Sequence, residues 1–196
     1  MVADRYDFSR VSILVADGNR FMRQTISHLL RAFGFTKIIE CDDGADAFEQ
    51  MRAQAVDIII CDAIMDPLDG LDFTRLVRQA PDCKAHEVPV ILLTGHSEHF
   101  RVLQARDLGA NEFLVKPVSA DTLWRRLVHV VEEPRAFVRS GRFTGPDRRR
   151  RFEEDFDGVE KRAGAAVGTL SQEEVAALLG NDNGETTEMT EAGAVV

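Results

Sequence analysis

Four short apolar runs in this chain each end in a residue able to bind phosphate or a metal ion. VSILVAD ends at Asp17, VDIIICD at Asp62, VPVILLT at Thr94 and EFLVK at Lys116. Short runs of aliphatic and β-branched residues are typical of strands buried on both faces, as in a parallel sheet. In open α/β sheets the ligand site lies beyond the carboxyl ends of the strands. The pattern therefore predicts that two acids, a hydroxyl and an amine converge on one site suited to phosphate and metal chemistry.

Stretches with helical spacing alternate with these runs from residue 11 to about 132. A further short strand is expected at KIIE, between a helix closed by Gly34 and a turn at Asp43-Gly44, and Pro134 ends the last helix. Because βα crossovers are right-handed, five such units predict an α/β fold with a doubly wound, five-stranded parallel sheet and helices on both faces.

Composition excludes several classes of protein. The chain has 196 residues, 44% of them hydrophobic, and a net charge of −9, which argues against general binding to DNA or membrane surfaces. The charged N-terminus shows no signal-peptide pattern, and no apolar run is long enough to span a membrane. Cys41, Cys61 and Cys83 lack C-x-x-C spacing, so we interpret them as reduced, buried thiols. We expect a cytoplasmic protein.

The composition changes after the last predicted helix. We expect one domain over 10–133 and a tail over 134–196 that is largely flexible, because GRFTGPDRRRRFEEDFDG has no apolar period. A short amphipathic helix is predicted near 171–179, with Ser171 and Glu174 forming a capping box. Such a short helix needs a partner surface. The side chains that it would bury there are Leu170, Val175, Leu178 and Leu179.

In this order and spacing, the strand-end residues resemble the receiver domain of bacterial two-component response regulators, over residues 11–132. The family's phosphoacceptor falls on Asp62, its switch hydroxyl on Thr94, its lysine on Lys116, its aromatic switch residue on Phe113 and its first acid on Asp17. The resemblance implies a flavodoxin-like sheet of order 2-1-3-4-5. It also implies a single, chemotaxis-regulator-like receiver, here followed by a tail that does not bind DNA.

The resemblance further implies a signalling role instead of an enzymatic one. A histidine kinase or phosphotransfer protein would phosphorylate Asp62, and the face around the fourth helix, fifth strand and fifth helix would then bind a downstream signalling protein. Mg²⁺ would neutralise the transferring oxygens, held by Asp17, Asp62 and the backbone carbonyl of Ile64. Lys116 would contact the phosphoryl group, and Thr94 would move toward it as the aromatic residue becomes buried.

One departure from the family pattern lies in the metal half of the site. The second acid of the family is Gly18 here, which predicts weak Mg²⁺ binding and slow phosphorylation. An alternative is a pseudo-receiver that acts as an interaction adaptor without phosphorylation. Ile64 and His96 fall where the family tunes autodephosphorylation, and the bulky Ile64 predicts a long-lived phosphoryl group. A phosphohydrolase is disfavoured, because such enzymes need an acid where Ile64 stands.

The tail carries a second, shorter resemblance. LSQEEVAALLG is similar to the N-terminal peptide with which the flagellar switch protein binds the phosphorylated chemotaxis receiver. It predicts intramolecular docking of the tail on the domain's own output face; the alternative is an incidental helix in a disordered tail. The run Arg148 to Arg151 is followed directly by EEDFD, which favours a solvated linker over a nucleic-acid site.

Overall fold

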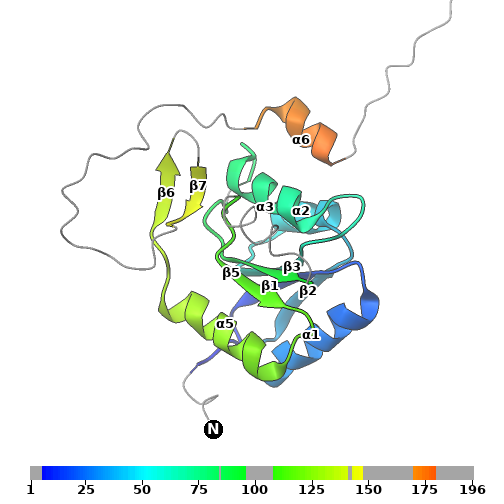
Figure 1. Ribbon diagram of the computed structural model, residues 1–196, viewed down its shortest axis with the longest axis vertical. Coiled ribbons are helices and arrows are strands. Elements are labelled where there is room, and N and C mark those ends of the chain that lie inside the picture. The colour runs from blue at the N-terminus through cyan, green and yellow to red at the C-terminus, as the bar shows by residue number, and fades with distance from the viewer. Residues whose placement is uncertain (1–5, 84, 96–107, 141–142, 148–169, 180–196) are drawn as a thin grey trace, which may run out of the picture.

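The protein folds around one parallel sheet, which the computed structural model shows in Figure 1. It describes residues 6–83, 85–95, 108–140, 143–147 and 170–179. The parallel strands are β1 (Ser12–Ala16), β2 (Lys37–Cys41), β3 (Ile58–Asp62), β4 (Val90–Thr94) and β5 (Glu112–Val115). Their spatial order is β2-β1-β3-β4-β5, with every neighbouring pair parallel. The predicted fold class and strand order are confirmed.

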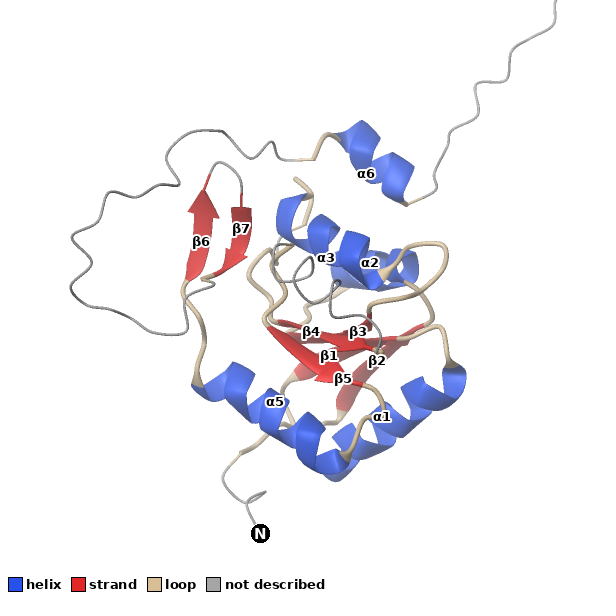
Figure 2. Cartoon of the chain, in the orientation of Figure 1, coloured by secondary structure: helices blue, strands red, loops and turns tan. Residues whose placement is uncertain are grey.

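Helices cover both faces of this sheet (Figure 2). They are α1 (Arg20–Ala32), α2 (Gly44–Ala53), α3 (Gly70–Gln79) and α5 (Ala120–Glu132). Because side chains alternate across a strand, successive residues of β1 enter two different apolar clusters. Ile13 belongs to the cluster that contains Leu123 of α5, and Leu14 to the cluster that contains Phe48 of α2 and Leu76 of α3. Burial on both faces explains the continuous apolar runs of the sequence.

Side-chain caps fix where the helices begin. Asn19, Asp43 and Asp69 precede α1, α2 and α3, and each accepts hydrogen bonds from two backbone N–H groups of the first turn. Gly34 follows α1 with a φ of 98°, a left-handed conformation that favours glycine. The predicted fourth helix lies almost wholly within 96–107, outside the described residues.

A small antiparallel hairpin follows the parallel domain, formed by β6 (Phe137–Ser140) and β7 (Phe143–Pro146). The sequence analysis expected only linker here. Phe143 is buried, and a Cβ on Gly145 would lie 2.7 Å from the Cα of Gly109, so the hairpin packs closely on the loop before β5. The guanidinium of Arg78 lies 5.5 Å from the ring centroid of Phe137. These long-range contacts, and not a local pattern, place the hairpin.

The predicted tail helix is present as α6 (Gln172–Leu178), and its Ser171–Glu174 capping box forms. The docking face of this helix was predicted wrongly, because the sequence analysis expected it on the output face around the fourth helix, fifth strand and fifth helix. Leu170 and Val175 are buried in the cluster that contains residues of α2 and α3, and the Leu170 N–H donates to the carbonyl of Gln79. The helix therefore lies beside α3, and α5 is on the opposite face of the sheet (Figure 1).

Within the described part of the chain, no helix has the length and apolar character needed to cross a membrane.

Candidate functional site

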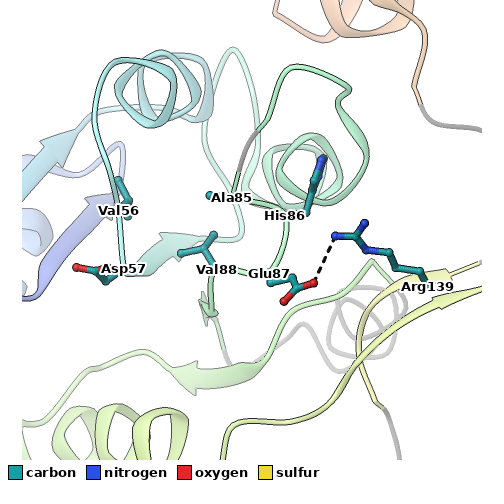
Figure 3. Close-up of a pocket in the computed structure, with 7 residues that line it drawn as sticks. All are labelled: Val56, Asp57, Ala85, His86, Glu87, Val88 and Arg139. Atoms are coloured by element: carbon teal, nitrogen blue, oxygen red, sulfur yellow. Dashed lines mark hydrogen bonds and ion pairs between the residues drawn. The ribbon is translucent and has the colours of Figure 1, made fainter.

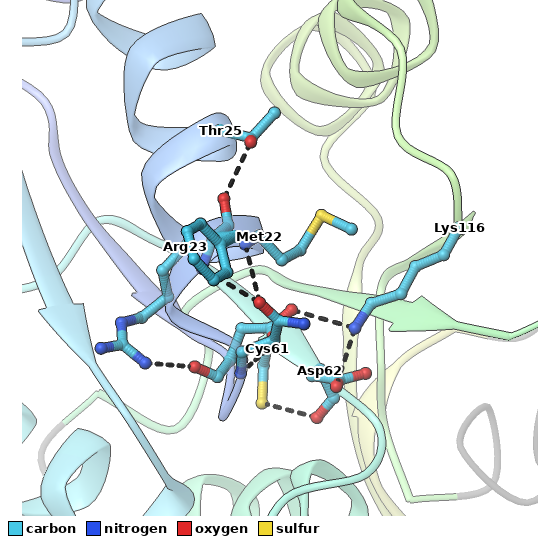
Figure 4. A network of polar contacts seen from close by, with 9 residues as sticks. Met22, Arg23, Thr25, Cys61, Asp62 and Lys116 are labelled. Carbon is cyan, nitrogen blue, oxygen red and sulfur yellow. Dashed lines mark hydrogen bonds and ion pairs between the residues drawn. The ribbon is translucent and has the colours of Figure 1, made fainter.

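Asp62, Asp17 and Lys116 meet at the carboxyl edge of the sheet. The Nζ atom of Lys116 lies 2.8 Å from Oδ2 of Asp62 and 2.9 Å from Oδ2 of Asp17. Figure 4 shows the lysine reaching from the chain after β5 toward Asp62. Three of the four strand-end residues singled out in the sequence are thus joined by ion pairs. One ammonium group bridges the two carboxylates.

Asp17 is held by hydrogen bonds to both its side chain and its backbone carbonyl. Its side chain is fully buried, and Oδ1 accepts a hydrogen bond of 2.8 Å from the N–H of Asn19. Its backbone carbonyl accepts a hydrogen bond of 2.6 Å from the guanidinium of Arg23 (Figure 4). The sequence analysis missed Arg23, whose only signal was its place six residues beyond the acid in the first turn of α1. These contacts preset the direction of the Asp17 carboxylate.

The start of α3 packs directly on the backbone of Asp62. A Cβ at Gly70 would lie 2.0 Å from the Asp62 carbonyl oxygen, so only glycine fits there. Asp69, the preceding residue, accepts hydrogen bonds from the N–H groups of Leu71 and Asp72. The Asp69-Gly70 pair therefore turns the chain sharply and starts a helix next to Asp62.

The other predicted site residues lie at different distances from the Asp17–Asp62–Lys116 cluster. Thr94 is buried at the end of β4, and its carbonyl accepts a hydrogen bond of 2.8 Å from the N–H of Lys116. Phe113 lies on β5, half-buried against the cluster shared with α2 and α3. Ile64 is exposed just beyond Asp62. The predicted tuning residue His96 lies outside the described residues.

The two partners of the main ion pair respond differently to burial. Burial raises the pKa of Asp62 above its ordinary value, and the hydrogen bond and charge of Lys116 offset this only in part. Burial alone would lower the pKa of Lys116, but its hydrogen bonds to Asp62 and Asp17 outweigh that effect and raise it. Lys116 is therefore a permanent cation in this site.

The acids present suit a small hard cation. Among the described residues no cluster of three or more His, Cys, Asp or Glu side chains forms a metal cage. Mg²⁺ is commonly held by one or two carboxylates, with water and phosphate oxygens completing the shell, and Asp17 and Asp62 supply that number. The position of the absent third acid is open: a Cβ on Gly18 would meet no atom nearer than the Asp42 carbonyl oxygen, at 3.7 Å.

Burial keeps the three cysteines in the less reactive thiol form. Cys41, Cys61 and Cys83 are buried and free, and burial raises the pKa of each thiol. They remain protonated near neutral pH and act as small apolar side chains, as the sequence analysis predicted.

A surface pocket lies at the opposite, amino edge of the sheet (Figure 3). Its polar groups already have partners: Glu87 pairs with Arg139 at 3.3 Å, Asp57 accepts from the N–H of Ser12, and Nδ1 of His86 lies 3.0 Å from the carbonyl of Val77. We assign no chemistry to this pocket.

Comparisons with known proteins agree with this geometry. Residues 13–128 match the family model of the response regulator receiver domain. The chain is 31% identical over 122 residues to the chemotaxis protein CheY of Pseudomonas aeruginosa, covering 62% of this chain and 97% of that protein. It is 30% identical to chemotaxis protein CheY-3 of Vibrio cholerae, covering 62% of this chain and 92% of that protein.

Solved structures show the same fold. Chemotaxis protein CheY4 of Vibrio cholerae superposes with a TM-score of 0.56 at 28% identity, covering 61% of this chain and 98% of that one. The receiver domain of a sensor histidine kinase from Pseudomonas aeruginosa, solved with a magnesium ion in its active-site cleft, gives a TM-score of 0.57 at 27% identity, over 63% and 98% of the two chains.

The chain belongs to the response regulator receiver family. Its receiver domain is similar to the single-domain chemotaxis regulators, and the β6–β7 hairpin and α6 lie beyond the matched residues.

Proposed function

We propose that the chain accepts a phosphoryl group on Asp62 from a histidine kinase or phosphotransfer protein of the cytoplasm. It then passes the signal to a downstream protein by contact and does not act as an enzyme on a separate substrate. The observation that carries this proposal is the Lys116 ammonium group, 2.8 Å from Asp62 and 2.9 Å from Asp17, at the ligand-binding edge of a parallel sheet.

Asp62 is placed to attack a phosphoryl donor, because its carboxylate is partly exposed at the strand end while Asp17 is fully buried. Lys116 remains charged and can exchange a carboxylate oxygen for a phosphoryl oxygen without moving far. The backbone of Asp62 is fixed by the close approach of Gly70, so the attacking oxygen is oriented before the donor arrives.

Mg²⁺, when bound by Asp17, Asp62 and the Ile64 carbonyl, would neutralise charge on the transferring oxygens. Because Gly18 supplies no third carboxylate, we propose that this ion binds weakly.

Thr94 and Phe113 are the proposed switch residues. Thr94 ends the strand next to β3, and its carbonyl accepts a hydrogen bond from the backbone N–H of Lys116. A shift of Lys116 toward a phosphoryl group would therefore also move Thr94. Phe113 lies on the neighbouring strand and is half-buried, so it would become more buried in the phosphorylated arrangement. Phosphorylation would thus change the populations of two arrangements of the face around β5 and α5.

A second candidate, an adaptor that works without phosphorylation, is favoured by one observation. Lys116 already pairs with both carboxylates and balances one of their two negative charges, so a cation is present in the resting site without a divalent ion.

Phosphotransfer from a labelled histidine phosphotransfer protein separates the two candidates. The first predicts that label moves to this chain and that Asp62→Asn prevents the transfer. The adaptor predicts that the label stays on the donor with both the wild-type chain and the Asp62→Asn variant. It also predicts that Asp62→Asn leaves partner binding unchanged.

A further inference from the structure

Helix α6 covers an apolar face formed by α2 and α3. Leu170 and Val175 are each 3% exposed, which is as deeply buried as many residues within the domain. They share one apolar cluster with Phe48 of α2 and Leu76 of α3, and Leu178 and Leu179 pack at its border. The tail segment therefore completes the core on this side of the molecule (Figure 1).

Polar contacts fix the orientation of α6 on this face. The N–H of Leu170 donates a hydrogen bond of 3.2 Å to the carbonyl of Gln79, the last residue of α3, where helix carbonyls lack a partner within the helix. The pKa of Glu174 is lowered mainly by its hydrogen bonds to Ser171, and the charge of Arg75 on α3 adds to the effect. The face thus offers an apolar surface, a backbone acceptor and a positive charge.

Nothing covalent close by holds α6 on this face. The helix spans seven residues, too few to be stable alone in water, so it depends on the surface that it covers. The 25 residues 147–171 separate it from β7, a chain length that reaches up to about 80 Å when extended. Since the helix is short and its connection long, α6 can leave this face and return to it while it stays tethered to the domain.

We propose that the α2–α3 face is a recognition groove for a short amphipathic helix with an acidic first turn, and that α6 is its tethered, exchangeable occupant in cis. A helix of the same pattern presented in trans must then compete with a tethered ligand at high effective concentration. The inference concerns a surface distinct from the phosphoacceptor site, and it holds whether or not Asp62 is phosphorylated.

The test uses the full chain and a fluorescent peptide with the sequence of residues 168–181. Val175→Asp places a charge on the buried face of α6 and should release it, so the variant should bind the peptide at least about tenfold more tightly than the wild-type chain. Ala177→Asp adds the same charge on the exposed side of the same helix and should bind the peptide like the wild type.

A second variant avoids the core altogether. Ser171→Ala combined with Glu174→Ala removes the capping box from exposed positions, and this variant should also bind the peptide more tightly than the wild type. In the Val175→Asp chain, an added Arg75→Glu should weaken peptide binding, and a peptide with Glu174→Lys should recover part of it.

Three outcomes overturn the proposal. If no chain binds the peptide at millimolar concentration, the α2–α3 face is not a recognition groove. If the wild-type and Val175→Asp chains bind it equally, α6 does not occupy the groove. If light scattering shows that the wild-type chain is a dimer that Val175→Asp dissociates, the occupant is the α6 helix of a second copy, not the tethered one.

Discussion

Two cations at opposite edges of the sheet, the half-buried Lys116 and the buried Arg78, are bound in different ways. Lys116 pairs with two carboxylates, Asp62 and Asp17. Arg78 is 1% exposed and donates to the carbonyls of Gly109, His86 and Val88 and to Oδ1 of Asn111. Within the described residues it has no carboxylate partner.

The difference indicates which of the two cations could exchange a partner for a phosphoryl group. The partners of Lys116 are ionisable groups at an exposed edge, so a phosphoryl oxygen can replace one of them. The partners of Arg78 are neutral dipoles of two loops, the one between α3 and β4 and the one before β5, which stay in place and need a fixed donor. Burial lowers the pKa of Arg78 to about 10, so it remains charged at neutral pH without an acid beside it. We therefore propose that Arg78 has a structural role and that Lys116 acts in phosphoryl transfer.

Arg78→Met tests the structural half of this comparison and should have the largest effect. It removes the side-chain donor to the buried carbonyls of Gly109 and Val88 and the contact with Phe137, so the free energy of unfolding in urea should fall by about 3–5 kcal/mol. Arg125→Met, which removes an exposed ion pair with Asp121, should cost less than about 1 kcal/mol. Equal losses for the two variants would break the comparison.

Lys116→Met tests the functional half. The phosphorylation rate with acetyl phosphate should fall about 100-fold, because the cation that faces the transferring oxygens is gone. Lys37→Met, on the exposed surface of β2, removes the same charge and should leave the rate unchanged. A rate for Lys116→Met within about threefold of the wild type would show that Lys116 only balances charge.

Gly18→Asp sharpens the account of the same cluster. The position has room for a side chain, and a third carboxylate should tighten Mg²⁺ binding about tenfold by calorimetric titration. Gly18→Ala fills the same space without charge and should bind Mg²⁺ like the wild type. No change with Gly18→Asp would mean that Lys116, not the missing acid, limits the metal.

The smallest expected effect lies far from both cations, at α6. The pKa of Glu174 is lowered by its hydrogen bonds to Ser171, so its stabilising contribution is present above the ordinary value of 4.5 and is lost as the pH falls through the lowered pKa. Amide NMR signals of α6 should therefore shift toward those of an unfolded segment in acid. Glu174→Gln should lack this step, and an unchanged α6 spectrum in acid would contradict the capping role.

The parts predicted correctly from the sequence were those with local signals. Each strand is a continuous apolar run, and its last residue falls at the ligand edge of the sheet, so the grouping of Asp17, Asp62 and Lys116 could be foreseen. The hairpin was missed because its position depends on Arg78, 59 residues before Phe137 along the chain. The α6 helix was foreseen from its caps, but its docking face depends on tertiary packing that no local pattern encodes.

Mass spectrometry after incubation with acetyl phosphate and Mg²⁺ tests the central claim most directly. The wild-type chain should gain a single increment of about 80 Da, one phosphoryl group, and Asp62→Asn should gain none. No gain in the wild-type chain, or an equal gain in Asp62→Asn, would contradict the claim that Asp62 is the phosphoacceptor.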